Sequence, residues 1–474
     1  MSGTMNSPSF SAEPAPAQRR SLHPILMMLG ILVFAMALTY LLDAGQFRRH
    51  GHLVEPGSYQ RIEKSNSPTH FFALSMPDST AERAYPASAV SLLRAIPDGL
   101  TKTSALIFMV MFVGGMFEVF KKTGALDSGL NKLVAVSKGN LYLLAPILIL
   151  AIGLGSTFLG LMSEYLVLLP VVLALGERLK LSPILSLAML AFGAKLGYIA
   201  SVSNPIVLPV AQGIAGVPLF SGAAVRFVVF VVAILSAIGY FIYCLHRTGY
   251  QAIRSSPADS KITASQKGVL LLMALATVVL VWAAPEFKWH NGELSAFYIF
   301  LAGVIALTGK LSAREAADAF VQGMKGMMLA ALLIGLAATI EIILQRSMVL
   351  DTVIDKLSST VTGQPPAIVA MGIMAIEAVL DLLVPSTSGK AAISMPILAP
   401  IAHISGLSPQ TCVLSFLLGN GIMGIINPAS GLTLAFLAIS KVGYGQWVRF
   451  AMPLVLILIG VALVTVTLAA NFGY

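Results

Sequence analysis

The chain has 474 residues, of which 57% are hydrophobic and only 11% are charged. A soluble globular domain carries about 25% charged residues, so this composition, with a mean hydropathy of +0.86, excludes an ordinary soluble protein and places most of the chain in lipid. The net charge is +9. Because the basic residues cluster in short segments beside apolar runs, the positive-inside rule accounts for this charge, and we expect no nucleic-acid partner.

The N-terminal region combines a polar tail with an apolar run. Residues 1–22 are rich in Ser, Pro and Ala and lack periodicity, which predicts a disordered cytoplasmic tail. The apolar run that follows, residues 23–42, is too long for the core of a signal peptide and is interpreted as a retained first span. Arg19 and Arg20 precede it, which places the N-terminus in the cytoplasm and the chain in a bacterial inner membrane.

Apolar segments of about 20 residues are needed to cross a bilayer. Nine such spans are predicted, at 24–44, 103–120, 183–216, 225–245, 268–284, 294–308, 326–345, 409–437 and 450–470. Residues 45–100 are polar and contain Pro, Gly and Asp, so they are expected to form a long extramembrane loop. With the N-terminus inside, every strongly basic short loop falls on the cytoplasmic side.

Two further apolar regions, 141–178 and 366–404, each hold two apolar arms around a small, polar centre. The arms have about 14 residues each, a length typical of re-entrant hairpins rather than of spans. Irregular backbone survives at membrane depth only when it is buried in protein or lines a watery cavity. We therefore predict that both hairpin tips face a cavity inside the protein.

The two halves of the chain resemble each other at a nearly constant offset. Leu126-Asp127 recurs as Leu350-Asp351, and Ser182-Pro183 recurs at almost the same separation as Ser408-Pro409. The predicted span at 268–284 separates the copies and gives them opposite orientations. Amphipathic segments at 125–138 and 349–362 are expected at opposite membrane interfaces.

These features define the predicted fold class and its domains. The fold class is an all-α membrane protein, an inverted-repeat transporter with two re-entrant hairpins, two broken helices and about nine spans. The first inverted repeat comprises residues 23–245, a cytoplasmic linker and connecting span comprise 246–293, and the second repeat comprises 294–474. Inverted repeats with broken helices are typical of secondary transporters, whose substrate lies near the bilayer midplane.

Asn-Pro pairs interrupt two predicted spans, at Asn204-Pro205 and Asn427-Pro428. Proline removes a backbone donor and breaks the helix, which frees backbone groups that can coordinate a cation or bind a carboxylate. One such pair alone would indicate a simple kink, whereas two at equivalent positions favour a binding site. Asn204 and Asn427 are also candidates for coordinating Na⁺. The candidate polar groups beside the breaks are Ser201, Ser203 and Ser430.

The hairpin tips present helix N-termini, whose free N–H groups and positive dipole end suit an anion. The candidate binding residues are Ser156, Thr157 and Ser163 at the first tip, and Ser386, Thr387, Ser388 and Gly389 at the second. Ordinary N-capping is the alternative interpretation of these residues. Thr387-Ser388-Gly389-Lys390 weakly resembles a nucleophile motif, but no accompanying base or zinc motif is found, so we do not expect an enzyme.

Intramembrane charges are functional candidates because burying them is costly. Glu164 and Lys390 occupy equivalent places in the two repeats, one at each tip. Lys390 could neutralise an anionic substrate, replace a coupling cation, or form a structural ion pair with Glu164. Lys195 is a second candidate for attracting an anion. Glu377 and Asp381, which share one helix face, are candidates for holding a proton or pairing with a lysine.

Cofactor chemistry is not indicated. Cys244 and Cys412 each lie within an apolar run and show no metal or redox spacing. We therefore predict no cofactor and no resident metal, with Na⁺ or H⁺ as the possible coupling ion. A channel is an alternative to a carrier, but re-entrant hairpins combined with broken helices fit alternating access better.

Long ordered segments resemble the C4-dicarboxylate anaerobic carrier family of YfcC/DcuC-like proteins, within the ion transporter superfamily. The segments are Val54–Tyr59, Lys122–Asp127, Ala211–Gly222 and Pro385–Pro400. The resemblance implies a membrane-embedded carrier of carboxylates, a homodimer, and an elevator motion of the hairpins and broken helices. The chain departs from the family pattern at Lys390 and Asn420, where relatives often carry Gln and Asp, and at Glu164, where they often carry paired glutamates.

The sequence therefore predicts a secondary active transporter of a small organic anion, a C4-dicarboxylate or a related carboxylate, coupled to an ion or working by exchange. The alternatives are transport of basic amino acids or short-chain fatty acids, or an anion channel. The sequence does not choose among these substrates.

Overall fold

The computed structural model describes residues 24–474 except 51–52, 56, 66, 74–78, 81, 137–138, 251–261, 288 and 385. The predicted tail, residues 1–22, and residues 251–261 of the predicted cytoplasmic linker lie outside the described residues. The helices of the first half are α1 (Pro24–Leu41), α2 (Ala89–Lys102), α3 (Ser104–Lys122), α4 (Ala125–Val136), α5 (Leu141–Leu159), α6 (Leu168–Arg178), α7 (Pro183–Ala200), α8 (Leu208–Ala215) and α9 (Ala223–Arg247). Those of the second half are α10 (Ala264–Glu286), α11 (Asn291–Thr308), α12 (Ala313–Gly326), α13 (Met328–Arg346), α14 (Leu350–Ser359), α15 (Pro366–Leu383), α16 (Thr387–Ile404), α17 (Pro409–Met423), α18 (Gly431–Ser440) and α19 (Tyr444–Phe472).

Nine of the described helices are long and apolar enough to cross a membrane, namely α1, α3, α5, α7, α9, α11, α13, α15 and α19. Seven of them coincide with predicted spans. The other two, α5 and α15, are the first arms of the predicted hairpins. They have 19 and 18 residues, so the prediction of arms too short to span was wrong for both. Helix α5 continues into the predicted polar centre as far as Leu159, where the Ser156 hydroxyl finds a buried hydrogen-bond partner. Helix α15 ends at Leu383, just before the second centre, and the buried Asp381 in its last turn is paired with Lys390.

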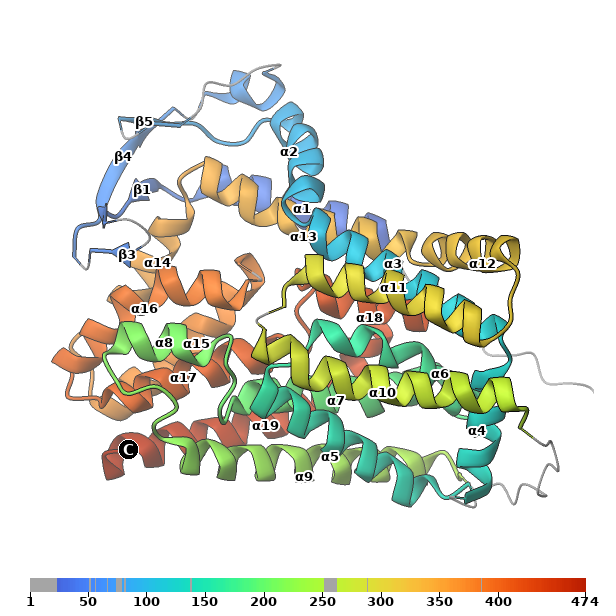
Figure 1. Cartoon of the computed structure of the whole chain (residues 1–474). Helices are drawn as coiled ribbons and strands as arrows, with labels where there is room; N and C mark the ends of the chain where they lie inside the picture. Colours follow the sequence, from blue (N-terminus) through green and yellow to red (C-terminus); the bar gives the residue numbers. More distant parts are fainter. Residues whose placement is uncertain are drawn as a thin grey trace, which may run out of the picture.

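The region between α1 and α2 forms small sheets at one end of the molecule (Figure 1). Strand β1 (Ala44–Gln46) pairs antiparallel with β4 (Gln60–Lys64), which pairs in parallel with β5 (Arg83–Ala84). Strands β2 (Arg49–His50) and β3 (Leu53–Val54) form a hairpin. The predicted loop 45–100 therefore ends in helix α2, which was missed because Pro97 and Asp98 interrupt its short apolar stripe.

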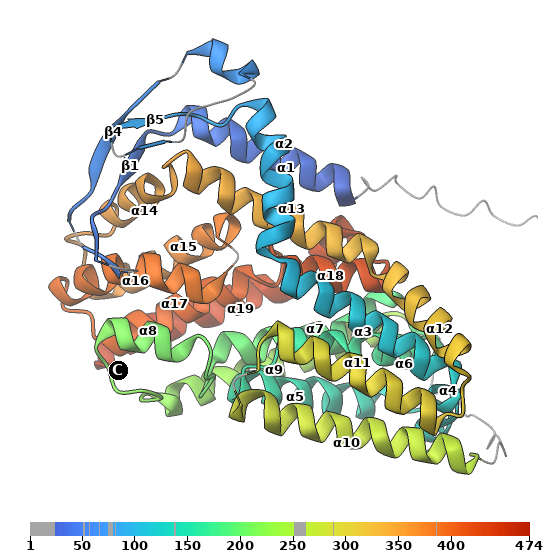
Figure 2. The ribbon, with the colours of Figure 1, turned by 45° about the horizontal axis from the view of Figure 1, so that its top comes forward.

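The order of helices in the first half recurs in the second. Helix α2 corresponds to α12 and α3 to α13, and the first residues of both pairs are separated by the same offset in sequence. The contacts recur as well. Gly99 on α2 packs against Thr339 on α13, and Gly323 on α12 packs against Gly115 on α3, which is the same contact with the two repeats exchanged. Helices α4 and α14 lie at opposite ends of the molecule (Figure 2).

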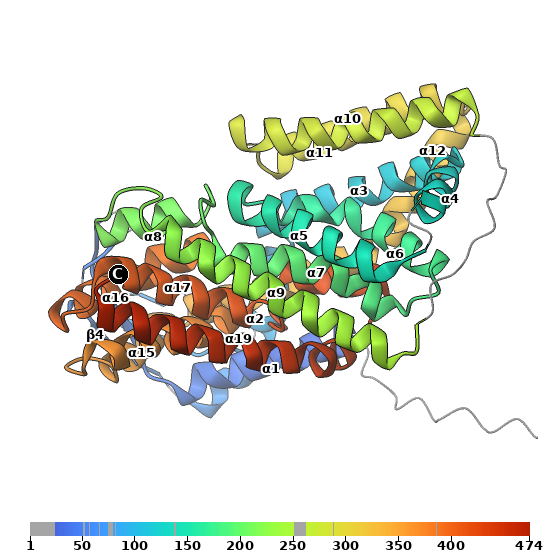
Figure 3. The same cartoon turned by 90° about the horizontal axis from the view of Figure 1, so that it is seen from below.

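The helices form two groups. The first group contains α1–α3 and α10–α13, and α10 and α11 run side by side along one edge of the molecule (Figure 3). The second group contains α5–α9 and α15–α19, with α7 and α17 packed against each other in its interior. The groups meet where α13 packs against α18.

Both Asn-Pro pairs break their helices at the predicted places. Helix α7 ends at Ala200 and α8 begins at Leu208, while α17 ends at Met423 and α18 begins at Gly431. In both turns the asparagine side chain accepts a hydrogen bond from the backbone N–H two positions later, from Ile206 and Ala429. This turn type satisfies backbone donors that the proline leaves outside a helix.

Two glycines allow the broken helices to approach the long hairpin arms. A Cβ on Gly419 of α17 would overlap the carbonyl oxygen of Met374 on α15. A Cβ on Gly193 of α7 would lie 2.7 Å from the carbonyl oxygen of Ile149 on α5. We predict that Gly419→Ala destabilises the fold, because overpacking costs about 1–3 kcal/mol. Thermal unfolding in detergent measures the effect.

Gly460→Ala is the matched control, since a Cβ on that helical glycine meets nothing within 4 Å. The control is expected to leave the melting temperature unchanged or to raise it, because alanine favours helix. Equal melting temperatures for the two variants would contradict the close approach of α15 and α17.

Candidate functional site

A cavity of about 400 Å³ lies between the two helix groups. The first group contributes Leu106 and Asn291. The second group contributes Met162, Ser163, Lys195, Tyr198, Asp381, Ser386, Thr387, Asn420, Gly421, Gly424, Ser430 and Leu432. The cavity therefore collects residues from both segments that were predicted to be hairpin tips, the ends of both interrupted helices, and two charged residues.

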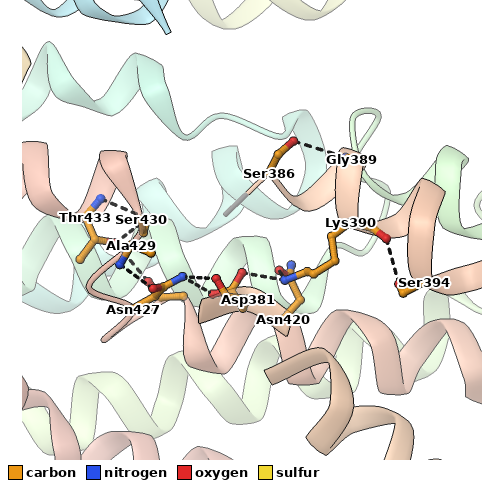
Figure 4. A network of polar contacts seen from close by, with 11 residues as sticks. Asp381, Ser386, Gly389, Lys390, Ser394, Asn420, Asn427, Ala429, Ser430 and Thr433 are labelled. Atoms are coloured by element: carbon orange, nitrogen blue, oxygen red, sulfur yellow. Dashed lines mark hydrogen bonds and ion pairs between the residues drawn. The ribbon is translucent and has the colours of Figure 1, made fainter. Parts of the chain in front are cut away.

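A buried ion pair lies at this cavity, and its acid, Asp381, is part of the cavity lining (Figure 4). Lys390 Nζ lies 2.7 Å from Asp381 Oδ1 and donates to Asn420 Oδ1 at 2.5 Å. Asn427 Nδ2 donates to the other carboxylate oxygen of Asp381 at 2.8 Å and to the Asp381 carbonyl at 2.6 Å. Lys390 and Asp381 are 1% and 4% exposed, so the two charges neutralise each other away from water.

The N-terminus of α16 faces the same cavity. Ser386 is its N-cap residue and accepts a hydrogen bond from the backbone N–H of Gly389 at 3.3 Å. Capping uses one of the free N–H groups of this helix end, and the positive end of the dipole remains directed at the cavity. Thr387 supplies a further hydroxyl to the lining. Ser388 belongs to α16, but its side chain lies outside the described part of the structure.

The first helix break is held mainly by internal bonds. Thr157 accepts from the backbone N–H of Val202 at 3.0 Å through its hydroxyl, and its carbonyl accepts from Ser203 N at 3.2 Å. Ser156 donates to the Ala194 carbonyl at 2.7 Å. Ser201 has a φ of 42°, a left-handed conformation that turns the chain sharply out of α7. These side chains position the break and are not part of the described cavity lining.

Asn204 itself is fully buried, and its amide is only half satisfied. Its oxygen accepts from Ile206 and Val207, while Nδ2 has no hydrogen-bond partner among the described residues. The equivalent nitrogen of Asn427 donates to Asp381. The two breaks therefore share a turn geometry, but only the second one has an acid, Asp381, in contact with its asparagine.

Of the three alternatives for Lys390, the ion pair with Glu164 is not formed, because Lys390 pairs with Asp381, one of the two acids expected to hold a proton or pair with a lysine. Glu164 instead accepts hydrogen bonds from the backbone N–H of Met162 at 2.8 Å and from the Ser163 hydroxyl at 3.4 Å. A carboxylate at the start of a helix is stabilised by these free donors. Equivalent positions in the two repeats thus hold opposite charges that satisfy themselves within their own hairpins.

Lys195 is the charge at the cavity that has no ion pair of its own, since Asp381, the acid whose charge acts on it, is paired with Lys390. Lys195 is 7% exposed, lines the cavity, and has no ion pair or hydrogen bond from its ammonium group within the described ranges. Since Asp381 is neutralised by Lys390, the two charged residues of the lining and Lys390 together carry a net charge of +1. The site is therefore suited to a negatively charged group.

Several residues that the sequence did not single out complete the site. Arg226 on α9, 1% exposed, donates to the carbonyls of Ser201 at 3.2 Å and Val202 at 3.1 Å. Trp447 on α19 has the same role in the second repeat, where its Nε1 donates to the Ile425 carbonyl at 2.9 Å. Both satisfy carbonyls that the breaks release. The signal for Arg226 was a charge inside a predicted span.

Comparison with known proteins identifies the chain. Residues 23–471 match the family model described as the C4-dicarboxylate anaerobic carrier. The chain belongs to this family. It is 27% identical over 408 residues to YfcC of Escherichia coli (strain K12), whose name proposes a basic amino acid antiporter, with 80% of this chain and 81% of that protein covered.

A protein of Haemophilus influenzae is 27% identical over 441 residues, covering 87% of this chain and 81% of the relative. Among solved structures, MtrF of Neisseria gonorrhoeae, described as one of a class of antimetabolite efflux pumps, matches with a TM-score of 0.42 and 15% identity over 96% of each chain. By its family match and its apolar helices, this chain is a multi-pass membrane transporter of the C4-dicarboxylate anaerobic carrier family.

The ion pair in this family member can be tested by a double-mutant cycle. Lys390→Gln leaves the Asp381 carboxylate buried without its counterion, and we expect a loss of about 3–5 kcal/mol in the free energy of unfolding. Asp381→Asn should cost a similar amount. The double variant Asp381→Asn/Lys390→Gln should recover most of the loss in thermal unfolding, because no charge is then left unpaired.

The double variant Glu164→Gln/Lys390→Gln is the control. Glu164 has other partners, so its effect should add to that of Lys390→Gln without recovery. Recovery in this variant, together with none in the Asp381 pair, would contradict the assignment of the ion pair.

Proposed function

We propose that the chain is a secondary active transporter of a small organic anion, a C4-dicarboxylate or a related carboxylate, which binds in the 400 Å³ cavity. The uncompensated ammonium of Lys195 at the cavity is the observation that carries this proposal. A buried cation attracts an anion several times more strongly than in water, because the surrounding dielectric is low.

Hydrogen-bond donors around the cavity support a carboxylate in particular. Tyr198, Thr387 and Asn420 bring hydroxyl and amide groups from three helices, and the N-terminus of α16 faces the same space. A carboxylate accepts several such bonds at once. The cavity is large enough for a small diacid and lies within the range of ligand sites, about 300–1,000 Å³.

An alternating-access cycle is proposed from the arrangement of the helices. The cavity lies between the two helix groups, so a displacement of the second group against the first would carry the site from one side of the bilayer to the other. We propose an elevator-type motion, with α5–α6 and α15–α16 as re-entrant hairpins of two inverted repeats. The opposite placement of α4 and α14 supports the inversion.

We further propose a homodimer in the bacterial inner membrane with a cytoplasmic N-terminus. The basic residues Lys121, Arg178, Lys180 and Lys441 gather around one cavity at the end of the molecule where α4 and α12 lie, away from β4. A cluster of this kind is typical of the cytoplasmic side.

A basic amino acid antiporter is the second candidate. The Asp381 carboxylate lines the cavity, and it could receive a cationic side chain if Lys390 moved away. The name of the Escherichia coli relative points the same way. A basic amino acid substrate would be repelled by Lys195, whereas an anionic substrate is attracted by this lysine.

Counterflow in proteoliposomes distinguishes the two candidates. The wild type, loaded with an unlabelled carboxylate, is expected to exchange labelled C4-dicarboxylate or fatty acid and not labelled arginine or lysine. Lys195→Gln should raise the KM for the carboxylate by about tenfold or more, because a charged hydrogen bond is worth about 1.5–3 kcal/mol.

Lys180→Gln is the matched control. This lysine lines the basic cavity near α4 and α12, outside the proposed binding site, so its substitution should leave the KM unchanged. Arginine counterflow that persists or improves in Lys195→Gln would favour the basic amino acid candidate. Conductance at channel rates would indicate an anion channel instead. Sodium dependence that appears only in Lys390→Gln would show that the lysine replaces a coupling cation.

A further inference from the structure

Glu377 on α15 differs from the other buried acids that the structure describes. Its side chain is 0% exposed, and neither carboxyl oxygen has a hydrogen-bond partner in the described part of the chain. By contrast, Glu341 lies 2.9 Å from Lys102 and accepts from Gln345, and Asp351 pairs with Arg49. Glu377 is therefore buried without the compensation that the other acids receive.

The potential hydrogen-bond donors Lys390 and Ser394 beside Glu377 already have other partners. The titratable groups that interact electrostatically with Glu377 are Asp381 on its own helix, Lys390 on α16 and Cys412 on α17. Two of the three donor directions of the Lys390 ammonium go to Asp381 and Asn420. Ser394 lies beside Glu377, but the Ser394 hydroxyl donates to the Lys390 carbonyl at 2.9 Å.

An ionised carboxylate without donors suffers a large desolvation penalty, whereas the protonated acid does not. We propose that Glu377 holds a proton in this conformation and is the proton-binding site of the carrier, so that one proton moves together with the organic anion. The inference rests on the proposed transport function and names its coupling ion. H⁺ binds to a carboxyl oxygen of Glu377 on the side of the membrane where the anion binds. It leaves from this oxygen as H⁺ on the other side, where the anion is released.

The charges around the site explain why proton and anion would bind together. With Glu377 protonated, Lys195, Lys390 and Asp381 sum to +1, which favours an anion in the cavity. With Glu377 ionised, these three residues and Glu377 together sum to zero, and the anion loses its net attraction. By linkage, an anion that binds better to the protonated form must also make the proton bind more tightly.

Lys390 can transmit this change to the cavity. Its ammonium has one donor that is not used by Asp381 or Asn420, and its charge acts on Glu377. When Glu377 loses its proton, the new carboxylate competes with Asp381 for the lysine. Asp381, which lines the cavity, is then less neutralised and repels the anion. Release of the proton and release of the anion are thereby coupled through a single side chain.

Proton movement can be measured in proteoliposomes that contain a trapped pH-sensitive dye. An inward gradient of C4-dicarboxylate is expected to acidify vesicles that contain the wild type. Glu377→Gln mimics the protonated acid, so it should retain carboxylate counterflow while losing anion-driven acidification. Glu341→Gln is the control, since it removes a buried carboxyl that lies outside the site, and it should acidify like the wild type.

The results of these assays distinguish failure of this inference from failure of the proposed function. If the wild type shows carboxylate counterflow but no acidification, or if Glu377→Gln acidifies as the wild type does, the proton site is overturned and the transport proposal stands. If the wild type shows no carboxylate counterflow, the proposed function itself fails.

A second measurement covers the case in which Glu377→Gln does not fold. Calorimetric titration of the wild type with a C4-dicarboxylate, in two buffers of different ionisation enthalpy, reports protons taken up on binding. Uptake is expected, and it should increase as the pH is raised, because more of Glu377 is then ionised before the anion binds. An observed heat that does not depend on the buffer across this pH range would overturn the inference.

Discussion

A proline inside a buried helix leaves backbone groups that no longer have a partner in that helix, and in an apolar interior each of them must find another. The fold around both breaks is organised by this requirement. Asn204 and Asn427 satisfy backbone donors on the far side of the turn, and Arg226 and Trp447 satisfy carbonyls on the near side. The long final helices of the two repeats, α9 and α19, thus supply the caps for the broken helices.

The same requirement is met differently in the two repeats, and this difference determines the charge of the site. In the first half of the chain, Glu164 accepts hydrogen bonds from backbone and hydroxyl donors of its own turn. In the second, Asp381 meets Asn427 and needs a cation, which Lys390 supplies from the adjacent helix. Both tips are therefore internally neutral or self-capped, and Lys195 remains as the charge that a substrate can compensate.

Much of the architecture was predictable from the sequence, because lipid restricts the options for a backbone. Apolar length indicated the spans, and Asn-Pro indicated the positions of both breaks. Seven of the predicted site residues line the cavity, namely Ser163, Lys195, Asp381, Ser386, Thr387, Asn420 and Ser430.

The partner of Lys390 was not predictable from the repeat offset, because equivalent positions in two copies need not touch. Hairpin packing decides the pairing, and it brings Lys390 to Asp381 on the preceding helix. Helix α2 escaped prediction because it is short and contains Pro97.

The central claim is that an anion binds between the two helix groups and is held by Lys195. The most direct measurement is an experimental structure, by electron cryomicroscopy, of the protein with a bound C4-dicarboxylate. The account predicts ligand density in the 400 Å³ cavity, with one carboxylate against Lys195 and the other end towards Thr387 and the start of α16. Density that instead occupies another cavity, such as the 570 Å³ one beside Arg94 and Arg346, with the site at Lys195 vacant, would contradict it.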